Sequence, residues 1–409
     1  MKVTCPYCYE IFDSKDVMLR CRRCPEEEDN VYFAYWEKVD SENANKMQRH
    51  AYHIRHRFLR KDDMSCDVCG SKDYDYICPS CHNELPAKMV EDGAEIISVI
   101  GGPNSGKTHY IIALLYELRK HGYEIGLDAT LEQVGEDKNW HTDEMYRKAI
   151  RTLNTNHEVL QKTAQKSISL PWIIRLDSTD PKKNERQDPK KSIYLVFYDT
   201  AGESFEDNKQ IQANAQYLRQ SKAVIVLFDT TSIPAIKDIL LQKNEELGRS
   251  DADRDDFDIT WNTLKRFVID NEAVKNKPVA FVLSKFDVVL KYHERLGFDC
   301  SSFLSPSGLV DKSYINGLNV FDMNQIKDAH DAIASSMREW DMGAYPKEFK
   351  TIFPIGRFFG MSAIGSKPNG SIITTNSIRP YRVMDPLLWT MAKIGGFAFE
   401  TINDDTPKK

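Results

Sequence analysis

The sequence predicts a doubly wound α/β domain with a mostly parallel sheet, preceded by small zinc-ribbon modules. A glycine-rich loop near residue 101 lies between an apolar strand pattern and a helical pattern, and eight of the nine cysteines fall before residue 82. A chain of 409 residues can hold several domains. We expect a zinc-binding module at 1–45, a basic linker with a second module at 46–91, the α/β domain at 92–396 with insertions at about 125–170 and 291–350, and a tail at 397–409.

Composition excludes several classes of protein. The formal net charge of −6 argues against a protein that coats nucleic acid along its whole surface. No run approaches the roughly 18 apolar residues of a membrane helix, so we expect no membrane contact. The first residues, MKVTCPYCYEIF, hold no apolar secretion signal. We therefore expect a cytoplasmic protein whose cysteines are not disulfides.

The eight early cysteines form four Cys-x-x-Cys pairs: Cys5 and Cys8, Cys21 and Cys24, Cys66 and Cys69, Cys78 and Cys81. Each such pair delivers two thiolates from one tight turn, and Zn²⁺ takes four in a tetrahedron. The pattern predicts two structural zinc sites, with free or redox-active thiols as the alternative. Pairing in sequence order is expected, and a cross-braced pairing stays open. His82 is either a ligand or a surface histidine, and Cys300 is an ordinary thiol.

Residues 46–61, KMQRHAYHIRHRFLRK, form a basic segment between the cysteine groups. It holds six Lys or Arg and three His with no acid. It is either a surface for nucleic acid or an acidic partner, or a solvated helix face that bridges two modules.

A phosphate-binding loop follows the strand pattern at residues 95–100 and precedes a helical pattern at 109–122. Strand, G-x-x-x-x-G-K-T and helix together are the context that this motif requires. Its backbone N–H groups face phosphates, the lysine reaches the β- and γ-phosphates, and the threonine hydroxyl binds Mg²⁺. The predicted nucleotide-binding residues here are Gly101, Gly102, Pro103, Asn104, Ser105, Gly106, Lys107 and Thr108.

Three later segments extend this site. In DTAGE, Asp199 follows a strand pattern and is expected to hold Mg²⁺ opposite Thr108, while Gly202 approaches the γ-phosphate. In SKFD, Ser284, Lys285 and Asp287 follow another strand pattern. The Asp287 carboxylate can accept from both donors of guanine, for which adenine has no equivalent, and the Lys285 stem can cover the purine face. In SAIG, Ser362 and Ala363 are expected to donate backbone N–H groups to guanine O6.

In this order, GGPNSGKT, DTAGE, SKFD and SAIG resemble the motifs of Ras-like GTPases of the translation-factor-related class. The four cysteine pairs and YRVMDPLLW, residues 381–389, are more similar to the bacterial "double-GTPase 2" group. The resemblance implies GTP and GDP as ligands, Mg²⁺-dependent hydrolysis and a P-loop GTPase domain. It also implies a role in a multi-component bacterial conflict or stress system, with a protein partner such as a second GTPase.

Two positions depart from the pattern of that class. Ser284 replaces the usual Asn or Thr but keeps a hydroxyl, and Glu203 replaces the glutamine that orients the attacking water, so we expect slow hydrolysis. Lys107, Glu203 and a switch threonine are the expected catalytic residues. Thr163 is chosen for the last role because it lies upstream of the strand pattern at 171–178, with Thr130 and Thr179 as alternatives.

The predicted function is a GTP-dependent switch that hydrolyses GTP. The first alternative is a catalytically weak GTP-binding scaffold whose zinc modules form the interface, which Glu203 favours. A P-loop kinase or ATPase is a second alternative, opposed by Asp287, and a nucleic-acid regulator acting through 46–61 is a third. The insertion at 291–350, which contains a helical pattern, is interpreted as a lid or a partner surface.

Overall fold

A seven-stranded sheet forms the centre of the molecule, which is described from a computed structural model. The structure describes residues 2–23, 29–39, 55–56, 65–66, 68–101, 104–132, 142–160, 171–179, 192–198, 218–243, 261–262, 265, 275–310, 320–366, 368, 372–373, 378–395 and 401–402. The strands lie in the order β15 (Gly356–Gly360), β12 (Val279–Ser284), β11 (Ala223–Asp229), β7 (Ala94–Gly101), β10 (Ser192–Tyr198), β9 (Pro171–Ser178) and β8 (Leu127–Leu131).

The pairing of neighbouring strands confirms a mostly parallel sheet. β15, β12, β11, β7 and β10 are parallel, and only β9 runs antiparallel to its two neighbours, β10 and β8. Apolar β-branched runs form the central strands because both of their faces are covered by helices. The strand patterns at 95–100 and 171–178 correspond to β7 and β9.

Alternate residues of β7 enter two separate cores on opposite faces of the sheet. Ile97 and Val99 pack with α3 (Lys107–His121) and α14 (Asp385–Ile394). Ile96 and Ile100 belong to the other core, which also holds residues of α7 (Pro234–Gln242), α12 (Met323–Glu339) and α13 (Tyr345–Ile352). Helices on both faces define the doubly wound fold that was predicted.

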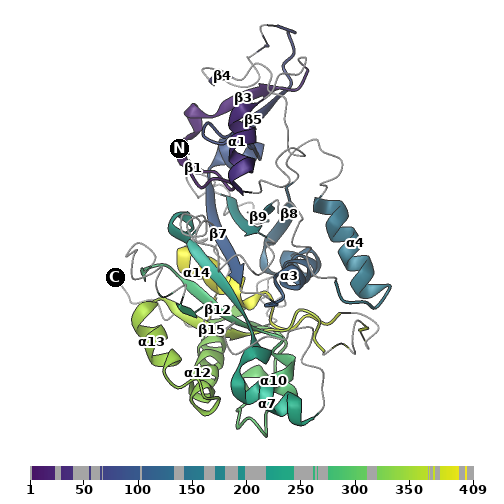
Figure 1. The fold of residues 1–409 in the computed structure, drawn as a ribbon, viewed down its shortest axis with the longest axis vertical. Coiled ribbons are helices and arrows are strands. Elements are labelled where there is room, and N and C mark those ends of the chain that lie inside the picture. The colour runs from purple at the N-terminus through teal and green to yellow at the C-terminus, as the bar shows by residue number, and fades with distance from the viewer. Residues whose placement is uncertain are drawn as a thin grey trace.

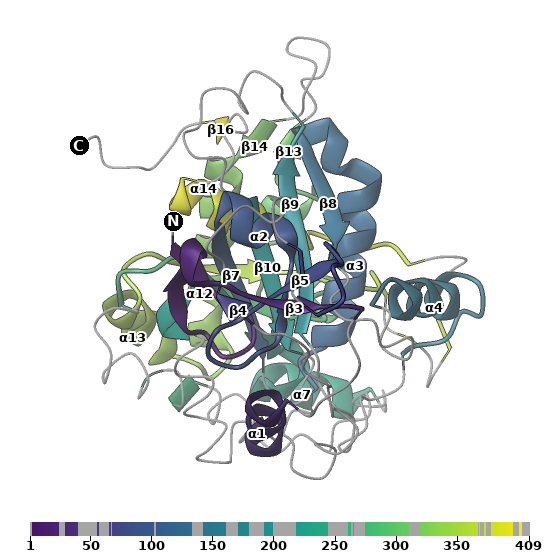
Figure 2. The same cartoon turned by 90° about the horizontal axis from the view of Figure 1, so that it is seen from above.

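The two predicted insertions differ in structure. The described part of 125–170 contributes β8 to the sheet and α4 (Thr142–Asn154), which lies beside α3 in both views (Figures 1 and 2). In 291–350, α12 buries Ala329, Ile333 and Met337 in the core. Its His330 accepts a hydrogen bond at Nδ1 from the Phe358 N–H of β15 at 3.0 Å. Because α12 completes the crossover from β12 to β15, it is part of the core and not a lid. The other interpretation of the insertion, a partner surface, stays a prediction.

The N-terminal cysteine-rich unit lies at the end of the sheet where β7 begins (Figure 1). Its strands and helices are β1 (Lys2–Thr4), β2 (Ile11–Asp13), η1 (Ser14–Asp16), β3 (Met18–Cys21), α1 (Asn30–Val39), β4 (Arg55–His56), β5 (Tyr74–Ile77), β6 (Glu84–Leu85) and α2 (Ala87–Asp92). Val3, Met89 and Val90 share a continuous core with Ile96 of β7. The unit is therefore packed onto the α/β domain.

The remaining elements connect or extend this framework. They are the short helices η4 (Gly122–Ile125), η7 (Thr230–Ser232), α10 (Asp287–Lys291) and η8 (Ser301–Phe303), and a small sheet of β13 (Leu309–Val310), β14 (Val320–Asp322) and β16 (Thr401–Ile402). Within the described ranges, no helix combines the length and apolar character needed to cross a bilayer.

A buried ion pair fixes the start of α14. Arg382 and Asp385 are 3% and 1% exposed, and Arg382 Nε lies 2.8 Å from Asp385 Oδ2. Asp385 Oδ1 accepts from the Gly308 N–H at 2.9 Å, and Arg382 also donates to Gln325 Oε1 at 3.0 Å. The segment YRVMDPLLW carries part of the family resemblance. Through Arg382 and Asp385 it connects the start of α14 to Gly308 and to Gln325 of α12.

We expect Asp385→Asn to lower the free energy of unfolding by about 3–5 kcal/mol, because it leaves the Arg382 guanidinium buried without its counter-ion. Denaturant titration followed by circular dichroism measures the loss. Asp331→Asn is the matched control, since Asp331 pairs with Lys327 at 2.8 Å with side chains 56% and 47% exposed. This control should change stability by less than about 0.5 kcal/mol. Equal losses in the two variants would contradict the assignment.

Candidate nucleotide site and cysteine clusters

The phosphate-binding loop connects β7 to α3 and uses two left-handed residues. Asn104 has φ +56° and Gly106, the N-cap of α3, has φ +76°. A Cβ on Gly101 would lie 2.5 Å from Ser105 Oγ and 3.0 Å from the Leu227 carbonyl oxygen, so a larger residue does not fit. Left-handed residues directly before a helix N-terminus are typical of loops whose N–H groups bind an anion.

Lys107 begins α3 and is 9% exposed. Its Nζ donates to the Gly101 carbonyl oxygen at 3.0 Å, so the ammonium lies over the loop itself. Gly102 and Pro103, the other predicted residues of the loop, lie outside the described residues. Contact of Lys107 with phosphate stays a prediction.

The SKFD segment begins with Ser284, the last residue of β12, at the same edge of the sheet. Ser284 is 2% exposed, and its hydroxyl donates to the Phe228 carbonyl oxygen at 2.9 Å. The hydroxyl thus joins the ends of β12 and β11, and Ser284 stays a predicted nucleotide-binding residue. Lys285 has φ +55° and Asp287 begins α10.

The SAIG segment follows β15 and is held by backbone pairing. The Ser362 N–H donates to the Tyr381 carbonyl oxygen at 3.0 Å, and Ser362 Oγ accepts from the Gly365 N–H at 2.9 Å. The expected donation from the Ser362 N–H to guanine O6 is thus wrong. Ala363 stays the predicted donor. The Met361 carbonyl oxygen accepts from the Phe286 N–H at 3.0 Å, which places SAIG beside SKFD.

The switch segments lie largely outside the described residues, including Thr163, Asp199, Gly202 and Glu203. The sheet register still separates the candidate threonines. Pro171 of β9 pairs with Tyr198, which precedes Asp199, so the chain enters β9 at the edge of the P-loop. Thr179 follows the opposite end of β9, and Thr130 lies within β8 opposite Arg175. Thr179 therefore lies away from the P-loop edge, whereas Thr163 and Thr130 stay candidates for the switch threonine.

His109 is a site residue that the sequence did not reveal. It follows Thr108, and its Nε2 accepts from the Leu160 N–H at 3.2 Å. Burial, and secondarily the charge of Lys285, lowers the pKa of His109 to about 4. The neutral ring therefore attaches the segment after α4 to the start of α3, next to the base-recognition segment.

We expect acid to weaken the fold through His109 between about pH 6.5 and pH 4. The unfolded chain, in which histidine has a pKa near 6.5, binds the proton more tightly than the folded chain. At pH 5 this difference amounts to about 2 kcal/mol. Urea titration of the unaltered protein and of His109→Gln at pH 7 and pH 5 measures it, because glutamine can accept from Leu160 without titrating. An identical pH dependence in both proteins would contradict this role.

Seven of the eight described cysteines form two clusters, and Cys300 belongs to neither. Cys5, Cys8, Cys78 and Cys81 form one, and Cys21, Cys66 and Cys69 form the other; within each, the sulfur atoms all lie within 4.8 Å of one another. Cys24 lies outside the described residues. The expected pairing in sequence order is wrong, because the first pair meets the fourth and the second meets the third. Each site therefore combines cysteines from both predicted modules.

Three of the cysteine turns share one backbone conformation. Tyr9, Gly70 and His82 each follow the second cysteine of a pair and have positive φ, and each donates its N–H to the carbonyl oxygen of the first cysteine at 2.8–3.1 Å. The Tyr7 and Ser80 N–H groups each donate to a cysteine sulfur at 3.4 Å. Donors aimed at sulfur stabilise thiolates, the form that binds a metal. The donor set fits zinc.

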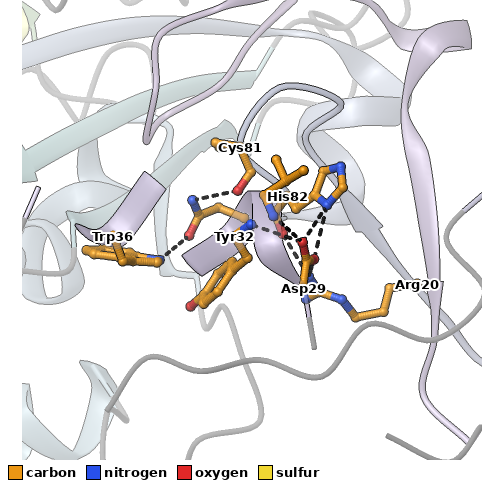
Figure 3. A network of polar contacts seen from close by, with 8 residues as sticks. Arg20, Asp29, Tyr32, Trp36, Cys81 and His82 are labelled. Carbon is orange, nitrogen blue, oxygen red and sulfur yellow. Dashed lines mark hydrogen bonds and ion pairs between the residues drawn. The ribbon is translucent and has the colours of Figure 1, made fainter. Parts of the chain in front are cut away.

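His82 has a different role from the one considered for it. Its Nδ1 lies 2.9 and 3.0 Å from the two oxygens of Asp29, and Arg20 lies 3.0 Å from Asp29 Oδ2 (Figure 3). Arg20 also donates to the His82 carbonyl oxygen at 2.9 Å. His82 therefore joins the turn of Cys78 and Cys81 to the start of α1 and is not among the clustered ligands.

The fold and the loop define a P-loop α/β protein with a ligand site at the carboxyl edge of its parallel strands. The sequence model of the Double-GTPase 2 family matches residues 95–302, and the chain belongs to this family. Family membership supports binding of guanine nucleotides.

One curated relative is the "Putative ESX-1 scaffolding and assembly protein SaeC" of Mycolicibacterium smegmatis. It is 23% identical over 331 residues, which cover 78% of this chain and 80% of the relative. Among solved structures, the Arl6 small GTPase of Trypanosoma brucei aligns with 10% identity and a TM-score of 0.26 over 74% of this chain and 98% of that chain. The Ski7 GTPase-like domain of S. cerevisiae aligns with 12% identity and a TM-score of 0.33 over 75% of this chain and 51% of that chain.

Proposed function

We propose that this protein binds GTP with Mg²⁺, hydrolyses it slowly and acts as a nucleotide-dependent switch. The observation that carries the proposal is the common edge at which the P-loop, SKFD and SAIG follow β7, β12 and β15. Lys107 would contact the phosphates, Asp287 the N1–H and amino group of guanine, and the Ala363 N–H the O6 atom. Binding of the nucleotide and release of phosphate would order and loosen the segment around 199–203.

The magnesium site would use the Thr108 hydroxyl at the start of α3 and Asp199, the residue after β10. The bound ion would neutralise charge on the β- and γ-phosphates. Thr163 is the proposed switch threonine, since it lies on the segment that enters β9 at the edge of the P-loop. These residues stay proposals that a complex with a non-hydrolysable GTP analogue tests directly.

The two cysteine clusters would each hold a structural zinc ion. The four described sulfurs of the first cluster supply a complete tetrahedral set, and Cys24 would supply the fourth ligand of the second. Their place is remote from the P-loop, at the start of β7, so the ions would act through folding. Elemental analysis should find two zinc ions per chain.

Single-turnover hydrolysis of radiolabelled GTP tests the enzymatic function. We expect a rate on the order of 10⁻⁴ to 10⁻³ s⁻¹, as for a small GTPase without an activating partner. Glu203→Gln should raise this rate several-fold, because an amide orients water without placing a negative charge beside the γ-phosphate. Lys107→Ala supplies the background. Phosphate release no faster than in Lys107→Ala would rule out hydrolysis while leaving GTP binding intact.

A second candidate is a GTP-binding scaffold with little turnover. Glu203 favours it, and the SaeC relative is named as a scaffolding and assembly protein. Under this proposal the cysteine-rich unit would bind a protein partner, such as a second GTPase of a bacterial conflict or stress system. Tight GTP binding with no turnover, together with nucleotide-dependent binding to a partner, would favour the scaffold.

Two further alternatives have direct tests. Equal affinity for ATP and GTP, unchanged by Asp287→Ala, would favour a kinase or ATPase. Nucleic-acid binding through 46–61, of which only 55–56 are described, should weaken steeply with salt if it occurs.

A further inference from the structure

Asp229 lies beside the base-recognition segment, although it belongs to a different strand. It ends β11, where it is the register partner of Ser284, the last residue of β12. The positive φ of Lys285 turns its side chain back toward β11, where its Nζ lies 2.6 Å from Asp229 Oδ2. The Asp229 side chain is 2% exposed and that of Lys285 is 37% exposed. A buried carboxylate therefore holds a half-exposed lysine.

The Asp229 carboxylate is itself fixed. Its Oδ1 accepts from the Thr231 N–H at 2.9 Å and from Thr231 Oγ1 at 2.7 Å. Its backbone carbonyl oxygen accepts from Ser232 Oγ at 2.7 Å. The Thr230 hydroxyl donates to the Ser284 carbonyl oxygen, and the Ser284 hydroxyl donates to the Phe228 carbonyl oxygen. Both oxygens of the Asp229 carboxylate thus have hydrogen-bond partners, and hydrogen bonds also connect the ends of β11 and β12. The carboxylate therefore holds the Lys285 ammonium in one position.

We propose that Asp229 is a positioning residue that determines how Lys285 covers the purine face of the nucleotide. The proposal rests on the GTP-binding function proposed above. An ammonium held by Asp229 leaves the aliphatic stem as the part of Lys285 that a base can contact. The side chain is then ordered before the nucleotide arrives, which removes an entropic cost of binding. Asp229 thus contributes to base affinity without touching the phosphates.

The test compares a ligand with a base and a ligand without one. We expect Asp229→Asn to weaken GDP and GTP binding about tenfold, while the competing affinity of inorganic triphosphate changes less than about twofold. In a Lys285→Met background the same substitution should have no further effect, because Asp229 acts only through the ammonium. A residue that only maintains the fold would weaken both ligands equally and would show no such dependence on Lys285.

Thr231→Val provides a second measurement if Asp229→Asn does not fold, which thermal melting of the unliganded protein reveals. It keeps the ion pair but removes the hydroxyl that fixes Oδ1, and we expect about a threefold loss of GDP affinity with triphosphate binding unchanged. Guanine-nucleotide affinities within a factor of two of the unaltered protein in the folded variants would overturn the proposal. Absence of GTP binding by the unaltered protein would instead overturn the proposed function, and this inference with it.

Discussion

Lys107→Ala should reduce the affinity for GTP and GDP by about 100-fold. A buried, charged hydrogen-bond donor contributes about 3 kcal/mol of binding free energy, which corresponds to a loss of this size. The Lys107 ammonium lies over the P-loop at 3.0 Å from the Gly101 carbonyl oxygen. It is 9% exposed, so water screens its interaction with phosphate only weakly. Alanine removes the charge while the left-handed residues Asn104 and Gly106 keep the shape of the loop.

Titration of a fluorescent GDP analogue measures this loss. Lys120→Ala is the matched control, because Lys120 lies on the same helix, close to its C-terminal end, and is exposed. We expect the control to bind as the unaltered protein does. A loss of less than threefold in Lys107→Ala would show that the phosphates bind elsewhere. The melting temperature of the unliganded variants separates a binding defect from a folding defect.

Cys78→Ser should remove one of two zinc ions and unfold the cysteine-rich unit. Cys78 is fully buried, and its Sγ lies 3.6 Å from Cys8 Sγ. A structural zinc site contributes about 10–16 kcal/mol in small zinc-binding peptides, as much as the whole stability of a typical domain. Because Val3, Met89 and Val90 share a core with Ile96, the α/β domain should melt at a lower temperature as well.

Elemental analysis and calorimetry test this result together. Cys300→Ser is the matched control, since Cys300 lies outside both clusters and should leave the zinc content and the melting temperature unchanged. An unchanged zinc content in Cys78→Ser would contradict the first site. Loss of zinc with an unchanged melting temperature of the α/β domain would contradict the shared core.

The sequence predicted the sheet and the P-loop well because their signals are local. The β-branched run at 95–100, the motif GGPNSGKT and the following helical pattern each depend on neighbouring residues, and β7 and α3 confirm them. The helical pattern in 324–340 was also local, and α12, Met323–Glu339, confirms it within one residue. Its role was misjudged because periodicity predicts a helix but does not say which sheet strand it covers.

Partners across the chain could not be predicted. Cys-x-x-Cys spacing predicts two ligands of a site but not which turn supplies the other two. The proximity of Cys5 and Cys81, whose sulfur atoms lie 3.7 Å apart, could therefore be seen only in the folded structure. Asp229 directly follows the apolar run 223–228. Its place at the end of a predicted strand was the one feature of the sequence that could have identified it as a site residue. Its contact with Lys285 depends on strand order, since β11 and β12 are neighbours only once the sheet has formed.

The nested arrangement of the cysteines also orders events during synthesis. Cys5 and Cys8 leave the ribosome first, yet their sulfur partners, Cys78 and Cys81, come late in the N-terminal unit. The inner cluster of Cys21, Cys66 and Cys69 can close before them. If zinc fills the outer cluster as proposed, its loading would come shortly before the emergence of β7, which begins at Ala94. A nascent chain starved of zinc would then present its first sheet strand without the layer that covers one end of it.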